Sequence, residues 1–251
     1  MEYITSRKNA HIAHIRKLIS SRAYRRETGQ MVCEGPKMLE EALRWGAEIT
    51  QIVQTQKASV PANLPPGVQR LQVLDDLLAW LSDTKTPQNS LFLCRIPESP
   101  PLPCETPRFL VLDGVQDPGN VGTIWRTADA FGAAGLILLG ACADPWSPKT
   151  LRATMGAAFR LPVWEMEAQS LVAQLKEREI PLYGAALMED TLDIQALSLH
   201  KAAVVIGSEG RGISDEVLAR CEKTIKIPMA ERCESLNAAV AASVVLWEMA
   251  R

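Results

Sequence analysis

The chain has 251 residues, of which 47% are hydrophobic, so it can bury a sizeable core in one large domain or two modest ones. Its formal net charge of −2 argues against a protein that coats nucleic acid indiscriminately, because non-specific binding requires many phosphate contacts from Lys and Arg. Six cysteines without a C-x-x-C pair, and three histidines without ligand spacing, predict neither a metal site nor a redox motif.

The chain begins with a polar and basic segment. Residues 1–30 contain seven Lys and Arg side chains and two Glu side chains, a net charge of +5, so the remaining residues carry a net −7. No apolar stretch in residues 1–12 could serve as a signal peptide or membrane span, and we expect a cytoplasmic protein without a membrane segment. A basic segment of this kind is either a solvated helix face or a nucleic-acid contact, and both interpretations stay open on charge alone.

The first hundred residues alternate between helical and strand patterns. Ile12, Ile15 and Ile19 recur at helical spacing, and a second helical pattern over residues 38–43 ends before Gly46. Short runs typical of strands follow at residues 49–53, 68–73 and 91–94. This alternation predicts a small α/β domain over residues 1–96. Five prolines in residues 97–108 then predict an extended linker, because proline lacks a backbone donor.

After the linker the pattern changes to short apolar runs that are mostly leucine-rich or β-branched. These runs lie at residues 109–112, 136–139, 182–185, 203–206 and 225–227. They predict a mainly parallel sheet that is buried on both faces. Helices are expected at residues 121–131, around 171–178, at 214–220 and from 236 to the end. The sequence therefore predicts a second α/β domain over residues 109–251.

Polar residues and glycine follow the first of these strands, in the segment D-G-V-Q-D-P-G-N-V-G-T-I-W-R at 113–126. Residues 117–119 predict a turn, Asn120 stands where a helix cap belongs, and Arg126 lies one to two helical turns further on. Because ligands bind at the carboxyl ends of strands in open α/β sheets, Asn120 and Arg126 are candidate site residues. A helix cap and a surface ion pair would explain them equally well.

A second glycine-rich segment, G-S-E-G-R-G at 207–212, follows the run at 202–206. Its glycines allow a ligand to approach the backbone closely, and Glu209 adds a carboxylate. The spacing matches neither G-x-G-x-x-G nor the P-loop, which disfavours a nicotinamide or nucleoside-triphosphate enzyme. A tight turn from strand to helix is the alternative interpretation.

A third segment, I-P-M-A-E-R-C-E-S-L-N at 227–237, precedes an alanine-rich helical pattern. Ser235 is suited to cap that helix, which would leave Asn237 available for a second contact. Taken alone, the segment is more typical of a buried core helix than of a binding site.

Together the three segments resemble the three motifs of the SpoU/TrmH family of RNA 2′-O-methyltransferases. The resemblance rests on N-x-G-x-x-x-R at 120–126, on G-S-E-G at 207–210, and on I-P-M followed by S-L-N at 235–237. It implies an α/β fold in which a parallel-sheet catalytic domain with a C-terminal trefoil knot follows a small α/β RNA-binding domain.

The resemblance also implies an activity, the S-adenosylmethionine-dependent methylation of a ribose 2′-hydroxyl in RNA, with no metal. The cofactor contacts that carry over are Gly207, Ile227, Met229 and Leu236. The catalytic residues that carry over are Asn120, Arg126, Glu209, Ser235 and Asn237, with Arg126 as the group that activates the hydroxyl. Because guanidinium stays protonated in proteins, we interpret Arg126 as an electrostatic group and expect a carboxylate or water to accept the proton.

The first domain resembles the substrate-binding domain of rRNA-directed members through S-R-K-N-A-H-I and V-C-E-G-P-K-M-L-E-E-A. The residues that this resemblance places against phosphates and 2′-hydroxyls of folded RNA are Arg7, Lys8, Arg22, Arg25 and Arg26. Such a domain favours rRNA over tRNA as the substrate. The family's homodimer is also implied. The final helix, with Val244, Val245, Leu246 and Trp247, contributes either to that dimer or to the core of one subunit.

Two alternative functions stay open from the sequence: a tRNA 2′-O-methyltransferase, and a non-catalytic RNA-binding protein that retains the fold. A nucleotide-dependent metabolic enzyme is a third, weakened by the missing phosphate-loop signature. The target nucleotide is not encoded in any motif that the sequence displays.

Overall fold

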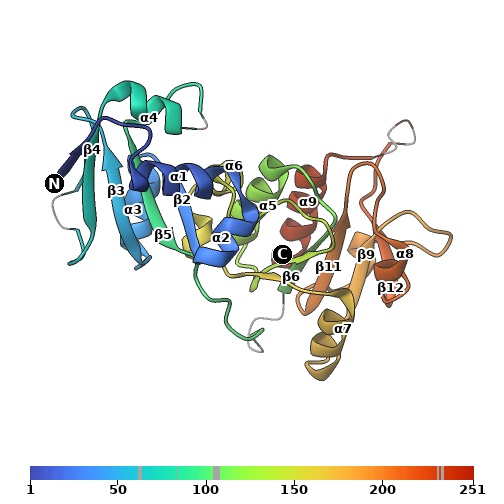
Figure 1. Cartoon of the computed structure of the whole chain (residues 1–251). Coiled ribbons are helices and arrows are strands. Elements are labelled where there is room, and N and C mark those ends of the chain that lie inside the picture. Colours follow the sequence, from blue (N-terminus) through green and yellow to red (C-terminus); the bar gives the residue numbers. More distant parts are fainter. Residues whose placement is uncertain (62–63, 83, 104–107, 231, 233–234) are drawn as a thin grey trace. The chain divides into compact units, whose positions relative to one another are not determined.

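The computed structural model describes the chain except for residues 62–63, 83, 104–107, 231 and 233–234 (Figure 1). It divides into two compact units. The first consists of Met1–Glu98 and Asp144–Phe159, and the second of Ser99–Ala143 and Arg160–Arg251. The division after Glu98 falls inside the predicted linker. The inclusion of Asp144–Phe159 in the first unit differs from the single continuous domain predicted for residues 109–251.

The first unit is built around a five-stranded mixed sheet. Its elements are β1 (Glu2–Ile4), α1 (Ala10–Ser20), α2 (Arg22–Thr28), β2 (Gln30–Glu34), α3 (Pro36–Arg44), β3 (Ile49–Gln54), β4 (Gln69–Val73), α4 (Asp75–Leu81), β5 (Ser90–Arg95), α6 (Pro148–Thr154) and the 3-10 turn Ala157–Phe159. The strand order is β1-β4-β3-β5-β2, with β5 antiparallel to both neighbours and the other pairs parallel. The predicted α/β alternation is confirmed, whereas the sequence patterns did not indicate β1 or β2.

Helix α1 shows how the amino-terminal pattern produces its structure. The side chain of Asn9 accepts a hydrogen bond from the backbone N–H of His11 and so caps the helix. Ile12, Ile15 and Leu18 recur at helical spacing and are fully buried against the sheet. The charged residues therefore occupy the opposite, solvated face of the helix.

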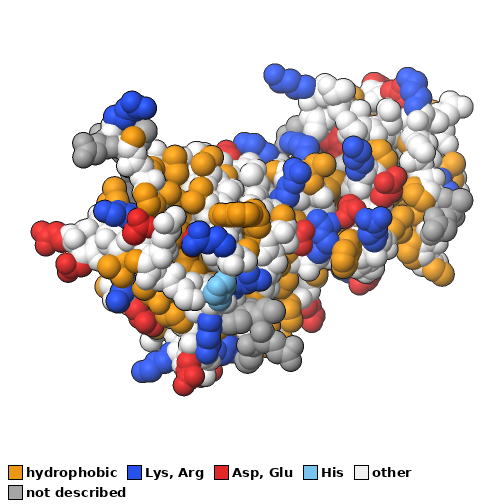
Figure 2. Space-filling model, turned by 180° about the vertical axis from the view of Figure 1, so that it is seen from behind, with side chains coloured by type: hydrophobic (Ala, Val, Ile, Leu, Met, Phe, Trp, Pro, Cys, Tyr) orange, Lys and Arg blue, Asp and Glu red, His pale blue; other side chains and the backbone are white. Residues whose placement is uncertain are grey.

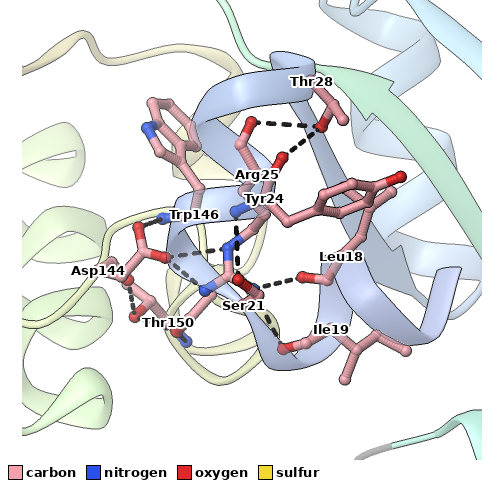
Figure 3. A network of polar contacts seen from close by, with 10 residues as sticks. Leu18, Ile19, Ser21, Tyr24, Arg25, Thr28, Asp144, Trp146 and Thr150 are labelled. Atoms are coloured by element: carbon pink, nitrogen blue, oxygen red, sulfur yellow. Dashed lines mark hydrogen bonds and ion pairs between the residues drawn. The ribbon is translucent and has the colours of Figure 1, made fainter. Parts of the chain in front are cut away.

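A buried ion pair holds residues 144–159 in the first unit (Figure 3). The Nε and Nη2 of Arg25 donate to Oδ2 of Asp144 at 2.9 and 2.5 Å. Its Nη1 donates to the carbonyl oxygens of Leu18 and Ile19, in the last turn of α1, where carbonyls lack helical partners. On the other side, Oδ1 of Asp144 accepts from the N–H of Trp146. One guanidinium thus joins the end of α1 to a segment that lies more than a hundred residues further along the chain.

The second unit contains a seven-stranded sheet whose pairs are all parallel. Its elements are β6 (Arg108–Asp113), α5 (Pro118–Ala130), β7 (Gly135–Leu139), β8 (Val163–Glu165), α7 (Ala168–Glu177), β9 (Leu182–Ala185), β10 (Leu192–Asp193), the 3-10 turn Ile194–Ala196, β11 (Ala202–Gly207), α8 (Asp215–Leu218), β12 (Lys223–Lys226) and α9 (Ala238–Ala250). The strand order is β10-β12-β9-β11-β6-β7-β8. The predicted parallel sheet is confirmed.

The order of the strands reverses beside β6. From β6 the chain proceeds to β7 and β8 on one side, and β11 lies on the other side. Such a reversal leaves a crevice at the carboxyl ends of the two central strands, which is where open parallel sheets bind ligands. The segments that follow β6 and β11, each expected to carry site residues, both start at this edge, where Asp113 is the strand partner of Gly207.

Helix α9 packs against α5 and against the two central strands, β6 and β11. Ala238, Ala242 and Val245 on its inner face are buried, and the small alanines allow close approach. This packing brings the start of α9 beside the start of α5, so the third motif lies near the first.

Figure 2 shows one face of the molecular surface, on which Lys and Arg side chains are interspersed with acidic and apolar ones. This distribution agrees with a net charge close to zero. Among the residues that the structure describes, no helix has both the length and the apolar character needed to cross a membrane.

Candidate active site

A pocket of about 310 Å³ opens at the carboxyl ends of β9, β11 and β12, within the size range of small-molecule sites. The four residues predicted to contact a cofactor all line it: Gly207, Ile227, Met229 and Leu236. Glu209 and Ser235, two of the predicted catalytic residues, also lie on its wall. The structure therefore brings together residues from two of the three sequence motifs.

The segment that follows β9 is a part of the pocket that sequence reasoning missed. Ala185, Ala186 and Leu187 form one side of it. The run at 182–185 was predicted as a strand, and the same rule about strand carboxyl ends would have pointed to the residues after it. They carry no glycine or charge pattern that would attract notice.

Gly207 lines the pocket and has no room for a side chain. A Cβ atom at this position would lie 2.1 Å from the carbonyl carbon of Gly212. The two backbones approach so closely because Ser208 and Gly212 exchange a pair of hydrogen bonds of 3.0 and 2.9 Å across a tight loop. The close approach of the loop backbone is therefore the reason that only glycine fits at this position.

A directed chain of hydrogen bonds runs beside the pocket, from α9 through α5 to the carboxylate of Glu209. Oδ1 of Asn237 accepts from the backbone N–H groups of Ala239 and Val240 at 2.9 and 3.3 Å. Its Nδ2 donates to Oδ1 of Asn120 at 3.3 Å, and Nδ2 of Asn120 donates to Oε1 of Glu209. Since backbone N–H groups can only donate, they determine the orientation of both amides. The chain therefore points an N–H donor at the carboxylate and holds it in position.

Two helix caps differ from the sequence predictions. Asp117, and not Asn120, caps α5, because its side chain accepts from the N–H of Asn120. Asn237, and not Ser235, caps α9. Ser235 is exposed at the pocket wall instead. The predictions were wrong because Ser, Asn and Asp have nearly equal capping preference, so position alone does not choose among them.

Arg126 lies on the exposed face of α5, and the structure does not join it to the hydrogen-bonded chain. Within the part of the chain that the structure describes, its guanidinium has no ion pair or hydrogen bond. The carboxylate of Asp129, one turn further along, is held by Arg160 at 2.7 Å. Arg126 therefore presents an uncompensated positive charge at the surface of the helix that also carries Asn120.

Two thiols lie close to the strand ends and stay protonated at neutral pH. Burial raises the pKa of Cys221 to about 11, and the charge of Asp113 adds to this effect. Burial likewise raises the pKa of Cys142. A neutral thiol is a poor nucleophile, so neither cysteine is suited to covalent catalysis here.

The structure separates the five predicted RNA contacts of the first unit. Arg7, Lys8 and Arg26 are exposed, and Arg22 is half-buried. The prediction for Arg25 is wrong, because this side chain is buried and its donors are engaged by Asp144 and by the end of α1 (Figure 3). A basic residue in a basic segment was interpreted as solvated, although its position on α2 turns it inward.

Comparisons with known proteins agree over both units. Residues 107–247 match the model of the SpoU rRNA Methylase family, and residues 9–91 match the MRM3-like substrate binding domain. The 23S rRNA (guanosine(2553)-2′-O)-methyltransferase RlmP of Bacillus subtilis is 31% identical over 249 residues, which cover 99% of each chain.

Two solved structures extend the similarity. The AdoMet-bound rRNA methyltransferase from Sinorhizobium meliloti has a TM-score of 0.86 at 28% identity, and the match covers 99% of this chain and 97% of that one. The SpoU methyltransferase AviRb from Streptomyces viridochromogenes, in complex with AdoMet, has a TM-score of 0.88 at 25% identity, and the match covers 97% of each chain.

Proposed function

The chain belongs to the SpoU rRNA Methylase family, and on that basis we propose that it transfers a methyl group from S-adenosylmethionine to a ribose 2′-hydroxyl of ribosomal RNA. The observation that carries this proposal is the oriented chain from Asn237 through Asn120 to Glu209, which ends beside an apolar pocket. The Bacillus subtilis relative, a 23S rRNA 2′-O-methyltransferase that matches the chain along its whole length, supports rRNA as the substrate class.

The pocket fits a cofactor of this kind. Its lining is mainly apolar, with Ile227, Met229 and Leu236 available for the adenine and ribose carbons, and Gly207 contributes backbone to its wall. Bound S-adenosylmethionine supplies an electrophilic methyl carbon on a sulfonium. Everything else that the reaction requires has to come from the side chains around the pocket.

Glu209 is the proposed proton acceptor. In methyl transfer the ribose 2′-oxygen bonds to the methyl carbon, the carbon–sulfur bond breaks with its electron pair going to sulfur, and the hydroxyl proton is lost. Oε1 of Glu209 is occupied by Asn120, while its other oxygen has no hydrogen bond to the described residues. That oxygen can accept the proton once the ribose lies within hydrogen-bond reach. Asn120 and Asn237 hold the carboxylate in position, and Ser235 lies at the pocket wall where a ribose would enter.

Arg126 acts in this proposal through its charge. A guanidinium does not deprotonate in proteins, so it cannot be the base. Its positive charge, uncompensated by any described acidic side chain, can hold the phosphate next to the target ribose and lower the pKa of the hydroxyl.

The first unit is proposed to bind the structured RNA that surrounds the target nucleotide. Its match to a substrate-binding domain supports this role. The proposed contacts are Arg7, Lys8, Arg22 and Arg26, whereas Arg25 is buried and paired with Asp144. A cytoplasmic location goes with a ribosomal RNA substrate in a bacterial type of enzyme.

The proposal includes a homodimer formed through α9. Val245 and Leu246 are buried in the core of one subunit, but Val240 and Trp247 are 49% and 58% exposed. With the half-buried Val244 they form one stripe at helical spacing, and Trp247 packs edge-on against Phe131 at 5.8 Å between ring centroids. Such an apolar stripe on a surface helix favours a protein contact. Light scattering tests this dimer by comparing the molecular mass of Trp247→Glu with that of wild type. An unchanged mass would count against this face of α9 as the dimer interface.

A C-terminal trefoil knot is the remaining element of the proposal. Support comes from the path after β12. That strand lies near one edge of the sheet, whereas α9 packs against the central strands β6 and β11. The knot can be tested by pulling the chain from both ends and measuring its fully extended length. A knot retains a loop of chain, so this length will be shorter than that of an unknotted chain of 251 residues.

The test of the reaction is transfer of labelled methyl from S-adenosylmethionine to unmodified 23S rRNA, 16S rRNA and tRNA, followed by digestion to nucleosides. We expect a 2′-O-methylnucleoside from rRNA, and its loss with Arg126→Ala under single-turnover conditions. Methylation of tRNA alone would contradict the substrate class. Cofactor binding without transfer to any RNA would favour a non-catalytic RNA-binding protein, and Arg126→Ala turnover near wild type would refute the role given to Arg126.

A further inference from the structure

Two arginines that lie apart in the sequence share one aromatic ring in the first unit. The guanidinium carbon of Arg7 lies 5.0 Å from the ring centroid of Trp80, and that of Arg16 lies 5.1 Å from it. Arg7 precedes α1, Arg16 is on the exposed face of α1, and Trp80 is on α4. Both cations lie within cation–π range of one indole. The distance between the two guanidinium carbons therefore cannot exceed the sum of their two distances from the ring centroid.

Neither arginine has an acidic partner in the described part of the chain, although other arginines of the unit do. Arg25 pairs with Asp144, Arg44 with Glu41, and Arg95 with Glu48. The two acidic residues of α4 are engaged elsewhere. Asp75 is held by Lys57 at 2.5 Å, and Asp76 accepts from the backbone N–H of Leu77. Among the residues that the structure describes, the positive charge around Trp80 is therefore not paired with an acidic side chain.

Stacking on an indole uses the flat face of a guanidinium and leaves its N–H edge open. That edge has the fork geometry that binds phosphate oxygens in pairs. Trp80 is itself half-buried and packs against the hydrophobic core of the unit, so it is a firm platform. Two long side chains held on a firm platform lose less conformational freedom on binding than two free ones.

We infer that Arg7, Arg16 and Trp80 form a phosphate clamp that binds the sugar–phosphate backbone of the substrate RNA. This inference rests on the proposed function for the identity of the RNA. It adds Arg16 and Trp80 to the RNA contacts and places the main charge contact at the α1–α4 surface, away from the buried Arg25. The clamp contacts phosphates, so it contributes affinity and orientation without reading base sequence.

The salt dependence of binding tests the clamp directly. We would measure the dissociation constant of an rRNA fragment over a range of salt concentrations for wild type, Arg7→Gln, Arg16→Gln and the double variant. Each substitution is expected to lower the slope of log affinity against log salt by about 1, because one phosphate contact fewer releases about one counterion fewer. Arg44→Gln, which removes an exposed arginine paired with Glu41, is the matched control and should leave the slope unchanged.

Trp80→Leu separates the platform from the charge. It keeps an apolar side chain against the core but removes the aromatic face, so affinity should fall while the slope keeps its wild-type value. A melting curve for each variant shows whether the unit remains folded. At sub-saturating RNA, methyl transfer by the double variant should fall in parallel with its affinity, since the loss is in binding.

Two results would overturn the clamp. The first is a double variant with wild-type affinity and slope. The second is that wild type binds poly-L-glutamate as strongly as RNA and that the double variant loses affinity for both ligands equally. That result would identify an acidic protein as the partner. Absence of methyl transfer would count against the proposed function and leave this binding measurement intact, so the two failures are distinguishable.

Discussion

The protein contains two polar networks that use similar groups for different purposes. Around Arg25 and Asp144, a guanidinium and a carboxylate are buried, and backbone carbonyl and N–H groups engage their remaining sides. Around Glu209, two amides hold one carboxylate oxygen and leave the other open beside a pocket. A saturated network can only stabilise. A network with one open acceptor can exchange a proton with a ligand, and on this difference rests the proposal that the Glu209 network is catalytic.

The largest effect should come from replacing the carboxylate of Glu209, and it should appear in kcat. Glu209→Gln keeps an oxygen for Asn120 but removes the proposed proton acceptor, so we expect kcat to fall on the order of 10²–10⁴-fold. The melting temperature should stay near wild type, because the side chain is exposed. Single-turnover methyl transfer at saturating RNA measures the first quantity and a thermal melt the second. Turnover above half of wild type would show that another group accepts the proton.

Removing one partner of the Arg25–Asp144 network should instead lower the stability of the protein. Arg25→Met leaves the carboxylate of Asp144 buried and unpaired, which costs roughly 3–5 kcal/mol in the free energy of unfolding. Urea unfolding measures it, with Arg44→Met as the control for an exposed pair, expected to cost about 0–1 kcal/mol. Adding Asp144→Asn to Arg25→Met should recover part of the loss. Equal costs for Arg25→Met and Arg44→Met would mean that the buried pair is not structural.

Asn237 makes two kinds of contact. Its Oδ1 caps α9, and its Nδ2 donates to Asn120 in the hydrogen-bonded chain that leads to Glu209. Asn237→Asp keeps an oxygen for the helix N–H groups but removes the donor to Asn120. We expect stability to change by less than about 1 kcal/mol and kcat to fall about tenfold, the equivalent of one hydrogen bond. Asn237→Ala should lose both the cap and the donor. If the aspartate variant kept full activity, the chain would not position Glu209.

The smallest effect concerns the thiol of Cys221. Because burial raises its pKa to about 11, the folded state keeps the proton at a pH where the unfolded chain has released it. Its contribution to stability is therefore complete below the unfolded pKa and declines as pH rises towards about 11. Unfolding free energies between pH 8 and roughly pH 11 should fall less steeply for Cys221→Ser than for wild type. Identical slopes would exclude this thiol as a source of the alkaline loss.

The pocket was largely predictable from the sequence, and its hydrogen bonding was not. Gly207, Ile227, Met229 and Leu236 were assigned to a cofactor through motif resemblance, and all four line one cavity. The residues after β9 were missed because they are ordinary apolar residues. The capping roles of Asp117 and Asn237 were assigned to neighbours, since several side chains of equal capacity stand within three positions of each other.

What the sequence determined by itself was the alternation of helices and strands, the parallel sheet and the family, because periodicity, turn residues and motif spacing are local properties of the chain. Only the tertiary structure decided which charges are buried and which side chains meet. Arg25 and Arg26 are adjacent and chemically identical, yet one is buried against Asp144 and the other is exposed. Arg7, Arg16 and Trp80 are brought to one surface by the packing of α1 and α4. Such contacts join residues that are distant in the chain, so local patterns carry no information about them.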